Sequence, residues 1–116
     1  MSRVFVGVGS NEGDRLELIS QAIQRLGRLS GIRIVQMATI SETRPVGGPV
    51  QPDFLNTVVE LDTAQAPQEL LSMLQTLERE LGRVPSSERW GPRPIDLDIL
   101  LDETVYRADS PYWPLR

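Results

Sequence analysis

The sequence contains no cysteine and no histidine among its 116 residues. Without cysteine there can be no disulfide, no thiolate metal site and no cysteine nucleophile. The absence of histidine removes the most frequent general base and the commonest protein ligand for zinc. Any bound metal would therefore be held by oxygen atoms, which favours magnesium, calcium or manganese.

Long apolar runs and an excess of positive charge are also missing. No apolar run reaches the ~20 residues of a membrane span, and the N-terminus has no signal-peptide pattern. The formal net charge of −4 argues against broad attraction to nucleic acid, although a local basic patch is compatible with it. We therefore expect a soluble, cytoplasmic, monomeric protein that binds neither nucleic acid nor a membrane.

The rest of the composition is that of one globular domain covering residues 1–116, with 40% hydrophobic and 24% charged residues. Apolar and β-branched runs predict strands at Val4–Val8, Ile32–Ile40, Phe54–Leu61 and Ile95–Leu101. With a helix after the first and the third of them, the order is β-α-β-β-α-β. That order predicts an α+β, ferredoxin-like sandwich in which both helices cover one face of an antiparallel sheet.

The two helices are predicted from apolar residues at helical spacing. The first follows Asp14, which with Glu17 resembles a capping box, and it should end near Gly27–Gly31. The second should begin at Pro67 and end near Gly82. Its apolar stripe consists of Leu70, Leu74, Leu77 and Leu81.

The last predicted strand, within RWGPRPIDLDIL, carries Asp96 and Asp98 two positions apart. Aspartate is depleted in strands and costly to desolvate, and strand residues two apart face the same side. The two carboxylates should therefore share the open face, while Ile95, Leu97 and Ile99 face the helices. Paired carboxylates suit a hard divalent cation. The alternative is an exposed edge strand whose aspartates meet water or pair with arginines.

Prolines and glycines predict loops at Thr43–Asp53 and Arg83–Pro94. The second loop carries Arg83, Arg89 and Arg93, and arginine is suited to bidentate contacts with phosphate. Carboxylates for magnesium beside arginines for phosphate favour a nucleotide-phosphate site. For each arginine alone, a solvated loop is the alternative.

Further candidates lie in the strand FLNTVVEL and the segment GVGSNEGD. Asn56 offers a donor and an acceptor to a flat heterocycle, and Phe54, on the same face, could stack on such a ring. The alternatives are a solvent-facing amide and a core aromatic. GVGSNEGD joins a strand to a helix and resembles a phosphate cradle, although Asn11 within it is equally a turn or capping residue.

Three segments resemble the 6-hydroxymethyl-7,8-dihydropterin pyrophosphokinase family: VGVGSN, ETRPVGGPVQPDFLN and GRVPSSERWGPRPIDLDIL. The resemblance runs from the first predicted strand to about Leu101. It implies a ferredoxin-like fold and a transferase of folate biosynthesis, 2-amino-4-hydroxy-6-hydroxymethyldihydropteridine diphosphokinase. Such an enzyme moves the β,γ-pyrophosphoryl group of ATP to the hydroxymethyl oxygen of the pterin and leaves AMP.

The same resemblance implies roles for individual residues. Asp96 and Asp98 would hold two magnesium ions and, with Arg83 and Arg93, would form the catalytic set. The implied pterin-binding residues are Thr43, Val46, Phe54 and Asn56. The implied nucleotide-binding residues are Gln75, Glu78, Arg83, Arg89, Trp90, Arg93 and Ile99. A loop carrying Arg89 and Trp90 would close over both substrates, because phosphoryl transfer needs positioning and exclusion of water.

The chain departs from the family pattern at two places. Pro85 stands where many members have a second loop arginine. After the last predicted strand the chain continues as LDETVYRADSPYWPLR, without the histidine-bearing and aromatic-bearing segments that members usually have, so the C-terminal part reads as reduced or missing. Tyr112 or Trp113 could replace the second stacking aromatic.

Three functional hypotheses follow. The retained aspartates, arginines and Asn56 favour an active, minimal pyrophosphokinase. The departures at the C-terminus favour a degenerate, non-catalytic domain that binds ATP or a pterin. A ferredoxin-like interaction domain without this chemistry would be supported if Asp96 and Asp98 lay on opposite faces of the sheet, or far from Asn56.

Overall fold

The computed structural model describes residues 2–45, 50–83 and 92–102, with side chains in the last segment as far as Leu100. Its elements are β1 (Ser2–Ser10), α1 (Arg15–Gly27), β2 (Ile32–Met37), β3 (Ser41–Thr43), β4 (Phe54–Thr63), α2 (Pro67–Glu80) and β5 (Asp96–Asp102). Some residues discussed above lie outside the described parts: Val46, Pro85, Arg89, Trp90, Tyr112 and Trp113.

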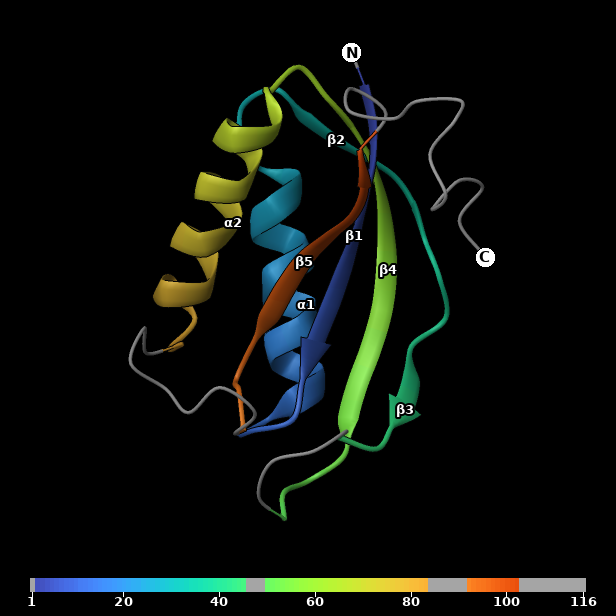
Figure 1. Cartoon of the computed structure of the whole chain (residues 1–116), viewed down its shortest axis with the longest axis vertical. Coiled ribbons are helices and arrows are strands. Elements are labelled where there is room, and N and C mark those ends of the chain that lie inside the picture. The colour runs from blue at the N-terminus through green and yellow to red at the C-terminus, as the bar shows by residue number, and fades with distance from the viewer. Residues whose placement is uncertain (1, 46–49, 84–91, 103–116) are drawn as a thin grey trace.

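The strands form one antiparallel sheet in the order β2-β4-β1-β5, and β3 pairs with the beginning of β4. β1 is central and pairs with β4 along its whole length, from Ser2 opposite Thr63 to Ser10 opposite Leu55. In Figure 1, α1 lies behind β1 and β5, and α2 lies to the left, beside β5. Buried residues of both helices join one core cluster with β1 and β5, which leaves the other face of the sheet open. The predicted α+β, ferredoxin-like arrangement is therefore confirmed.

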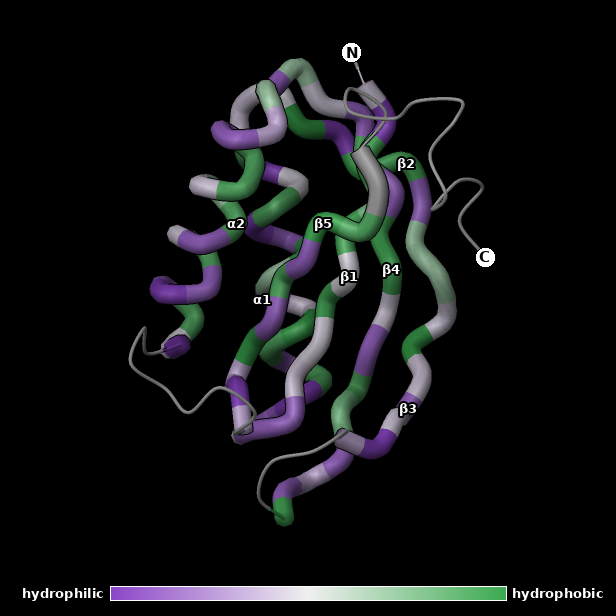
Figure 2. Tube along the Cα trace, viewed as in Figure 1, coloured by the Kyte–Doolittle hydropathy of each residue, from purple (hydrophilic) through white to green (hydrophobic). Residues whose placement is uncertain are grey.

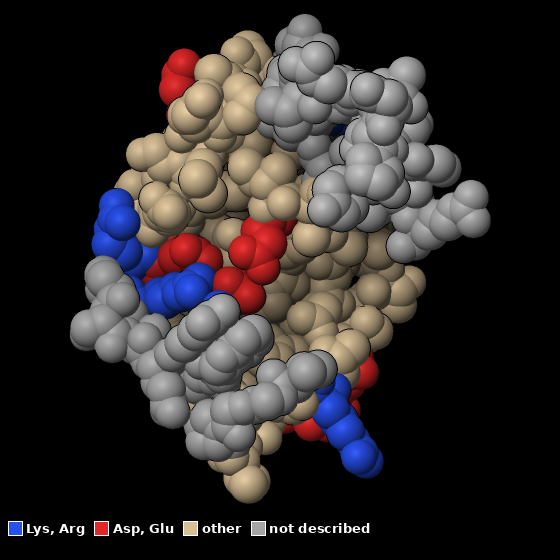
Figure 3. Space-filling view, in the orientation of Figure 1, with Lys and Arg blue, Asp and Glu red and all other residues tan. Residues whose placement is uncertain are grey.

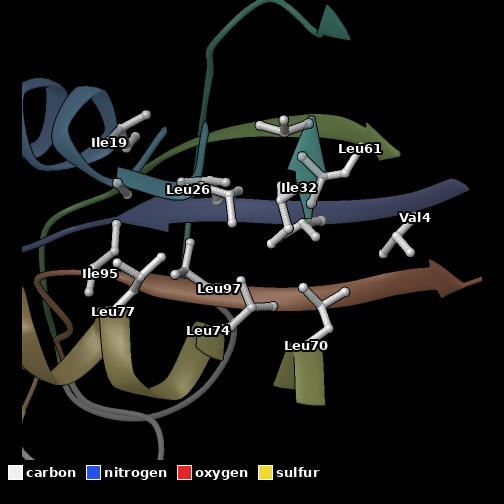
Figure 4. Packing of buried hydrophobic residues seen from close by; sticks show 14 of the residues in the cluster. Val4, Ile19, Leu26, Ile32, Leu61, Leu70, Leu74, Leu77, Ile95 and Leu97 are labelled. Carbon is white, nitrogen blue, oxygen red and sulfur yellow. The ribbon is translucent and has the colours of Figure 1, made fainter. Parts of the chain in front are cut away.

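The hydrophobic core fills the space between the sheet and the two helices. Along β1 the side chains of Val4, Val6 and Val8 are at most 1% exposed, and each buried aliphatic side chain contributes about 1.5–3 kcal/mol. Ile95 and Leu97 contact the same core, next to the leucines of α2 (Figure 4). Polar and hydrophobic residues alternate along the first part of β5, Asp96 to Ile99, as Figure 2 shows. This alternation fixes which face of β5 carries its aspartates.

The predicted helix ends agree with the structure. The Glu17 backbone N–H donates to Asp14 Oδ1 over 3.2 Å, so Asp14 caps α1 as expected. α2 begins with Pro67, and Gly82, just beyond its end, has φ of +103°. A left-handed glycine at this position is a common helix stop. No helix among the described residues is long and apolar enough to cross a membrane.

The strand predicted as continuous over Ile32–Ile40 is divided in the structure. β2 has a register shift between Ile34 and Gln36 and ends at Met37. The chain then leaves the ladder, held by a hydrogen bond from Thr57 Oγ1 to the Ala38 carbonyl (2.7 Å). It pairs with β4 again as β3, so Thr43, predicted to begin a loop, ends a strand opposite Phe54.

Candidate functional site

A row of paired residues crosses the open face of the sheet. Gly9 of β1 lies opposite Asp96 of β5 on one side and opposite Asn56 of β4 on the other, and Asn56 also lies opposite Ser41 of β3. Neighbouring strands are roughly 4.8 Å apart, so Asp96 and Asn56 stand about 10 Å apart across β1. Asp98 lies one step along the same face, opposite Gly7. The two aspartates thus share a face with Asn56, as predicted.

β1 contributes glycine at both of these positions. A Cβ atom added to Gly9 would lie 2.9 Å from Asn56 Oδ1 and 3.6 Å from Phe54 Cδ1. Real Cβ atoms are essentially never as close as the first of these distances. Glycine in a strand often marks a place where another group approaches the backbone closely. The surface between the two carboxylates and Asn56, called the floor of the site below, therefore consists of main-chain atoms of β1 without side chains.

Acidic and basic side chains gather at the β5 side of this floor, next to the end of α2 (Figure 3). Arg83 Nη1 donates to Asp96 Oδ1 over 2.9 Å, and Arg93 Nη1 donates to the same oxygen over 3.4 Å. The side chains of all three residues are 23% exposed. Two of the predicted loop arginines, Arg83 and Arg93, therefore lie beside Asp96 as expected.

Glu78 of α2 supports this cluster from the helix side. It is buried, and its Oε2 accepts hydrogen bonds from Arg83 and from the Leu97 backbone N–H (2.8 Å). Burial raises the pKa of the Glu78 carboxyl, with a further rise from Asp96, while Leu97 N–H and Arg83 oppose the change. Glu78 thus fixes the position of Arg83 relative to β5.

The second aspartate, Asp98, is exposed on the open face. Partial desolvation raises the pKa of the Asp98 carboxyl, and the neighbouring Asp96 carboxylate raises it further, against the lowering effect of Arg83 and Arg93. Because Asp98 is open to water, we expect the charge of Asp96 to be the more important cause. With Glu78, three carboxylates face two arginines, so the cluster has one negative charge in excess when all are ionised.

This donor set fits a magnesium ion. Among residues 2–45, 50–83 and 92–102, no group of three or more acidic, histidine or cysteine side chains is arranged to hold a metal. Magnesium is usually held by only one or two protein carboxylates, with phosphate and water oxygens completing its shell. Asp96 and Asp98 supply such a pair, and the excess negative charge favours a cation.

On the other side of Gly9, Asn56 Nδ2 donates to Thr43 Oγ1 over 2.6 Å. Asn56 Oδ1 points over Gly9, and the half-buried Phe54 also contacts the space above Gly9. Asn56 and Phe54 therefore share the open face, as predicted. An amide, a hydroxyl and an aromatic ring meet here at one corner of the sheet.

Asn11 joins the two sides, which the sequence analysis did not foresee. Its fully buried amide donates to Gln51 Oε1 (2.8 Å) and the Pro52 carbonyl (3.0 Å), and its Oδ1 accepts from the Arg93 backbone N–H (2.8 Å). Asp14, not Asn11, caps the helix. The amide of Asn11 is thus engaged by the protein in linking the segment before β4 to the segment before β5. Its burial and these three hydrogen bonds reveal this role.

The other candidates are placed less directly. Gln75 is exposed on α2, one turn before Glu78, and takes no part in the cluster of Glu78, Arg83, Arg93 and Asp96. Ile99 is half-buried and packs against the core, on the helix-covered face as predicted. Val46, Arg89 and Trp90 lie outside the described residues, so their roles stay predictions.

Comparison with known proteins places these features in a family context. The family model for 7,8-dihydro-6-hydroxymethylpterin-pyrophosphokinase (HPPK) matches residues 5–111. Two bacterial proteins named 2-amino-4-hydroxy-6-hydroxymethyldihydropteridine pyrophosphokinase are similar: that of Methylorubrum extorquens is 39% identical over 110 residues (95% of this chain), and that of Bacillus subtilis is 44% identical over 97 residues (84%). The mitochondrial folate synthesis bifunctional protein of Pisum sativum is 47% identical over 97 residues (84%). The chain spans 69%, 58% and 18% of these relatives, respectively.

Proposed function

Because the chain belongs to the 7,8-dihydro-6-hydroxymethylpterin-pyrophosphokinase family, we propose that it transfers the pyrophosphoryl group of ATP to the hydroxymethyl oxygen of 6-hydroxymethyl-7,8-dihydropterin and releases AMP. ATP and this pterin would be its substrates, and two magnesium ions its cofactors. Cytoplasmic location, a monomeric state and the absence of nucleic-acid or membrane binding stay predictions.

The observation that carries the proposal is the row Asp96–Gly9–Asn56 on the open face. A pterin held at Asn56 would point its hydroxymethyl group across the bare main chain of Gly9 toward the two carboxylates. The separation of about 10 Å, two strand spacings, suits a ring edge at one end and a phosphate-bound cation at the other. When the pterin and ATP are both held in this way, their reaction becomes effectively unimolecular, which lowers the entropic part of its activation barrier.

On the nucleotide side, Arg83 and Arg93 would contact the phosphates of ATP. In the structure both arginines pair with Asp96. Phosphate oxygens are equally good acceptors for a guanidinium group, so the arginines can turn from Asp96 to the nucleotide. The same exchange frees the Asp96 oxygen for a cation. The ion pairs of the cluster would thus be replaced as ATP and magnesium enter together.

Asp96 and Asp98 would hold the magnesium ions, which when bound supply positive charge to the transferred phosphates and orient them. The chain contains no histidine, and this chemistry needs no strong protein base because positioning and charge stabilisation dominate phosphoryl transfer. Glu78 would act indirectly, since it holds Arg83 and the main chain of Leu97 in place.

On the pterin side, the Asn56 amide would pair with the polar edge of the ring, and Phe54 would stack on one face. Thr43 already accepts a hydrogen bond from Asn56, which orients the amide before the ring arrives. Val46 would complete this edge through its backbone.

The decisive test is to incubate the protein with ATP, magnesium and the hydroxymethyl-dihydropterin and to measure AMP. We expect Asp96→Asn and Asp98→Asn each to lower kcat by about 100-fold or more, because an aligned metal ligand supplies several kcal/mol of transition-state stabilisation. Both variants should stay folded, since neither side chain belongs to the core.

Asp62→Asn is the matched control, because Asp62 is a strand aspartate that pairs with Arg33 over 2.6 Å. Its turnover should stay within about twofold of the parent. Normal AMP formation by both site variants would contradict the metal role. A parent that binds ATP and pterin but forms no AMP would support the alternative of a degenerate binding domain.

A further inference from the structure

Arg15 is a charged residue near the candidate site to which the motif analysis gave no role. It is the first residue of α1, directly after the cap Asp14. Its Nη1 donates to Glu42 Oε2 over 2.8 Å and to the Asp53 backbone carbonyl over 2.7 Å. The Arg15 side chain is only 30% exposed, although its partner Glu42 is 53% exposed. One guanidinium nitrogen therefore joins α1 to two other segments.

These two segments are the ends of the strands that carry the proposed pterin-binding residues. Glu42 lies in β3 directly before Thr43, and Asp53 lies directly before Phe54, the first residue of β4. Thr43 and Phe54 are themselves paired, at the end of the short β3–β4 ladder. β3 has only three residues, so this ladder is too short to be rigid by itself. Arg15 therefore contacts β3 and the residue directly before β4, at the end of this ladder where Thr43 and Phe54 would bind the pterin.

The phosphate side of the site is anchored differently. There, Glu78 holds Arg83 and Leu97, and Asn11 holds Arg93. The contacts of Arg15 go to β3 and to the residue before β4, not to this cluster. Loss of Arg15 should therefore affect the two substrates unequally, whereas loss of Asn11 should affect both.

We propose that Arg15 is a positioning residue that holds the Thr43–Phe54 end of β3 and β4 in the geometry needed to bind the pterin. This rests on the proposed function, since it names the part of the site that Arg15 controls. The Arg15 guanidinium makes a charge-assisted hydrogen bond to the Asp53 carbonyl and an ion pair with Glu42. Such contacts are stronger than neutral hydrogen bonds, and here the guanidinium is partly shielded from water. Arg15 would touch neither substrate and would act only through the two strand ends.

The test is Arg15→Met, which removes every donor but keeps a helix-forming side chain of similar length. We expect the pterin KM to rise about tenfold, because the variant loses two partly exposed, charge-assisted hydrogen bonds. kcat and the ATP KM should stay within about twofold. Arg15→Lys keeps the charge and a donor, so it should restore the pterin KM to within about threefold of the parent.

The control is Arg33→Met, the same substitution in another arginine that joins strands. Arg33 of β2 pairs with Asp62 of β4 over 2.6 Å, away from Thr43 and Phe54. It should leave both KM values within about twofold. An equal rise in both KM values for Arg15→Met, or the same pterin effect in Arg33→Met, would overturn the proposal.

Amide hydrogen exchange by NMR provides a readout that needs no substrate. In Arg15→Met the amides of residues 41–43 and 54–56 should exchange at least fivefold faster, with those of β5 unchanged. Unchanged exchange at residues 41–43 and 54–56 would refute the positioning role even if the pterin KM rose. A parent that binds no pterin, with faster exchange in the variant, would refute the proposed function and leave the strand-holding role standing.

Discussion

Gly9→Ala tests whether the open face must be bare between the two halves of the site. The added Cβ would lie 2.9 Å from Asn56 Oδ1 but 3.5 Å from the nearest main-chain atom, the Leu55 carbonyl oxygen. The second distance is an ordinary contact, so the backbone can stay where it is. The clash falls on the Asn56 amide, which must rotate and give up its 2.6 Å hydrogen bond to Thr43.

The expected effects on stability nearly cancel. Losing the Asn56–Thr43 hydrogen bond costs about 1 kcal/mol. Replacing a strand glycine with alanine recovers about 0.5–1 kcal/mol, because glycine loses more conformational freedom on folding. The free energy of unfolding should therefore change by less than about 1 kcal/mol. Pterin binding has no such compensation: a displaced amide should cost about 1–3 kcal/mol, which weakens binding about 5-fold to 150-fold.

The assay is calorimetric titration of the pterin, beside urea unfolding of the same samples. Gly7→Ala is the matched control, because it adds the same methyl group to the same strand and face. There the three atoms nearest to the new Cβ all belong to the Leu100 side chain, and the nearest lies at 3.5 Å, which is an ordinary contact. Gly7→Ala should therefore keep the parent's affinity for the pterin within about twofold.

Two results would refute the reasoning. Equal weakening of pterin binding by Gly7→Ala and Gly9→Ala would show that the effect is a general one on β1, not one on Asn56. Unchanged affinity in Gly9→Ala would show that Asn56 does not read the ring, or that the ring lies elsewhere.

Two further predictions concern the buried amide of Asn11 and the carboxyl group of Asp98. Asn11→Ala should lower the free energy of unfolding by about 3 kcal/mol, because the three hydrogen bonds of this buried amide are lost. It should also raise the KM values of both substrates; a loss below 1 kcal/mol in urea unfolding would contradict the linking role. Because the pKa of Asp98 is raised, the folded state binds the Asp98 proton more tightly than the unfolded state does. The stability gained from this proton is complete below the ordinary pKa of 3.8 and is lost as the pH rises through the pKa of the folded state. Asp98→Asn should remove the part of this pH-dependent loss of stability that Asp98 causes. Identical pH profiles of the free energy of unfolding for parent and variant, between pH 4 and neutrality, would contradict the raised pKa of Asp98.

Local sequence patterns were sufficient to predict much of the fold. Period-two alternation placed Asp96 and Asp98 on one face and the buried Ile95 and Leu97 on the other. The cap at Asp14 and the stop at Gly82 were likewise readable from single segments. These features depend on neighbours within a few residues, where propensity and side-chain direction decide the structure.

The features that could not be predicted depend on contacts between distant segments. The end of β2 at Met37 follows from a register shift against β4 and from the hydrogen bond between Thr57 and Ala38. Asn11 meets the Arg93 main chain 82 positions later, and Arg15 meets Glu42 27 positions later. No periodicity within one segment reports such meetings, because each of these side chains is an ordinary polar residue until the chain has folded.

The central position of β1 has a consequence for the order in which the protein can be made. Both neighbours of β1 in the sheet, β4 and β5, are synthesised after it. During synthesis on the ribosome, both edges of β1 therefore stay unpaired until residues 54–63 have emerged. β1 gains its second neighbour only when residues 96–102 follow. Pairings between such distant segments form slowly, because the loop that they close is long. An unpaired apolar strand invites pairing with other chains in the meantime. A nascent chain arrested before residue 54, with both edges of β1 unpaired, should accordingly be more aggregation-prone than the complete chain.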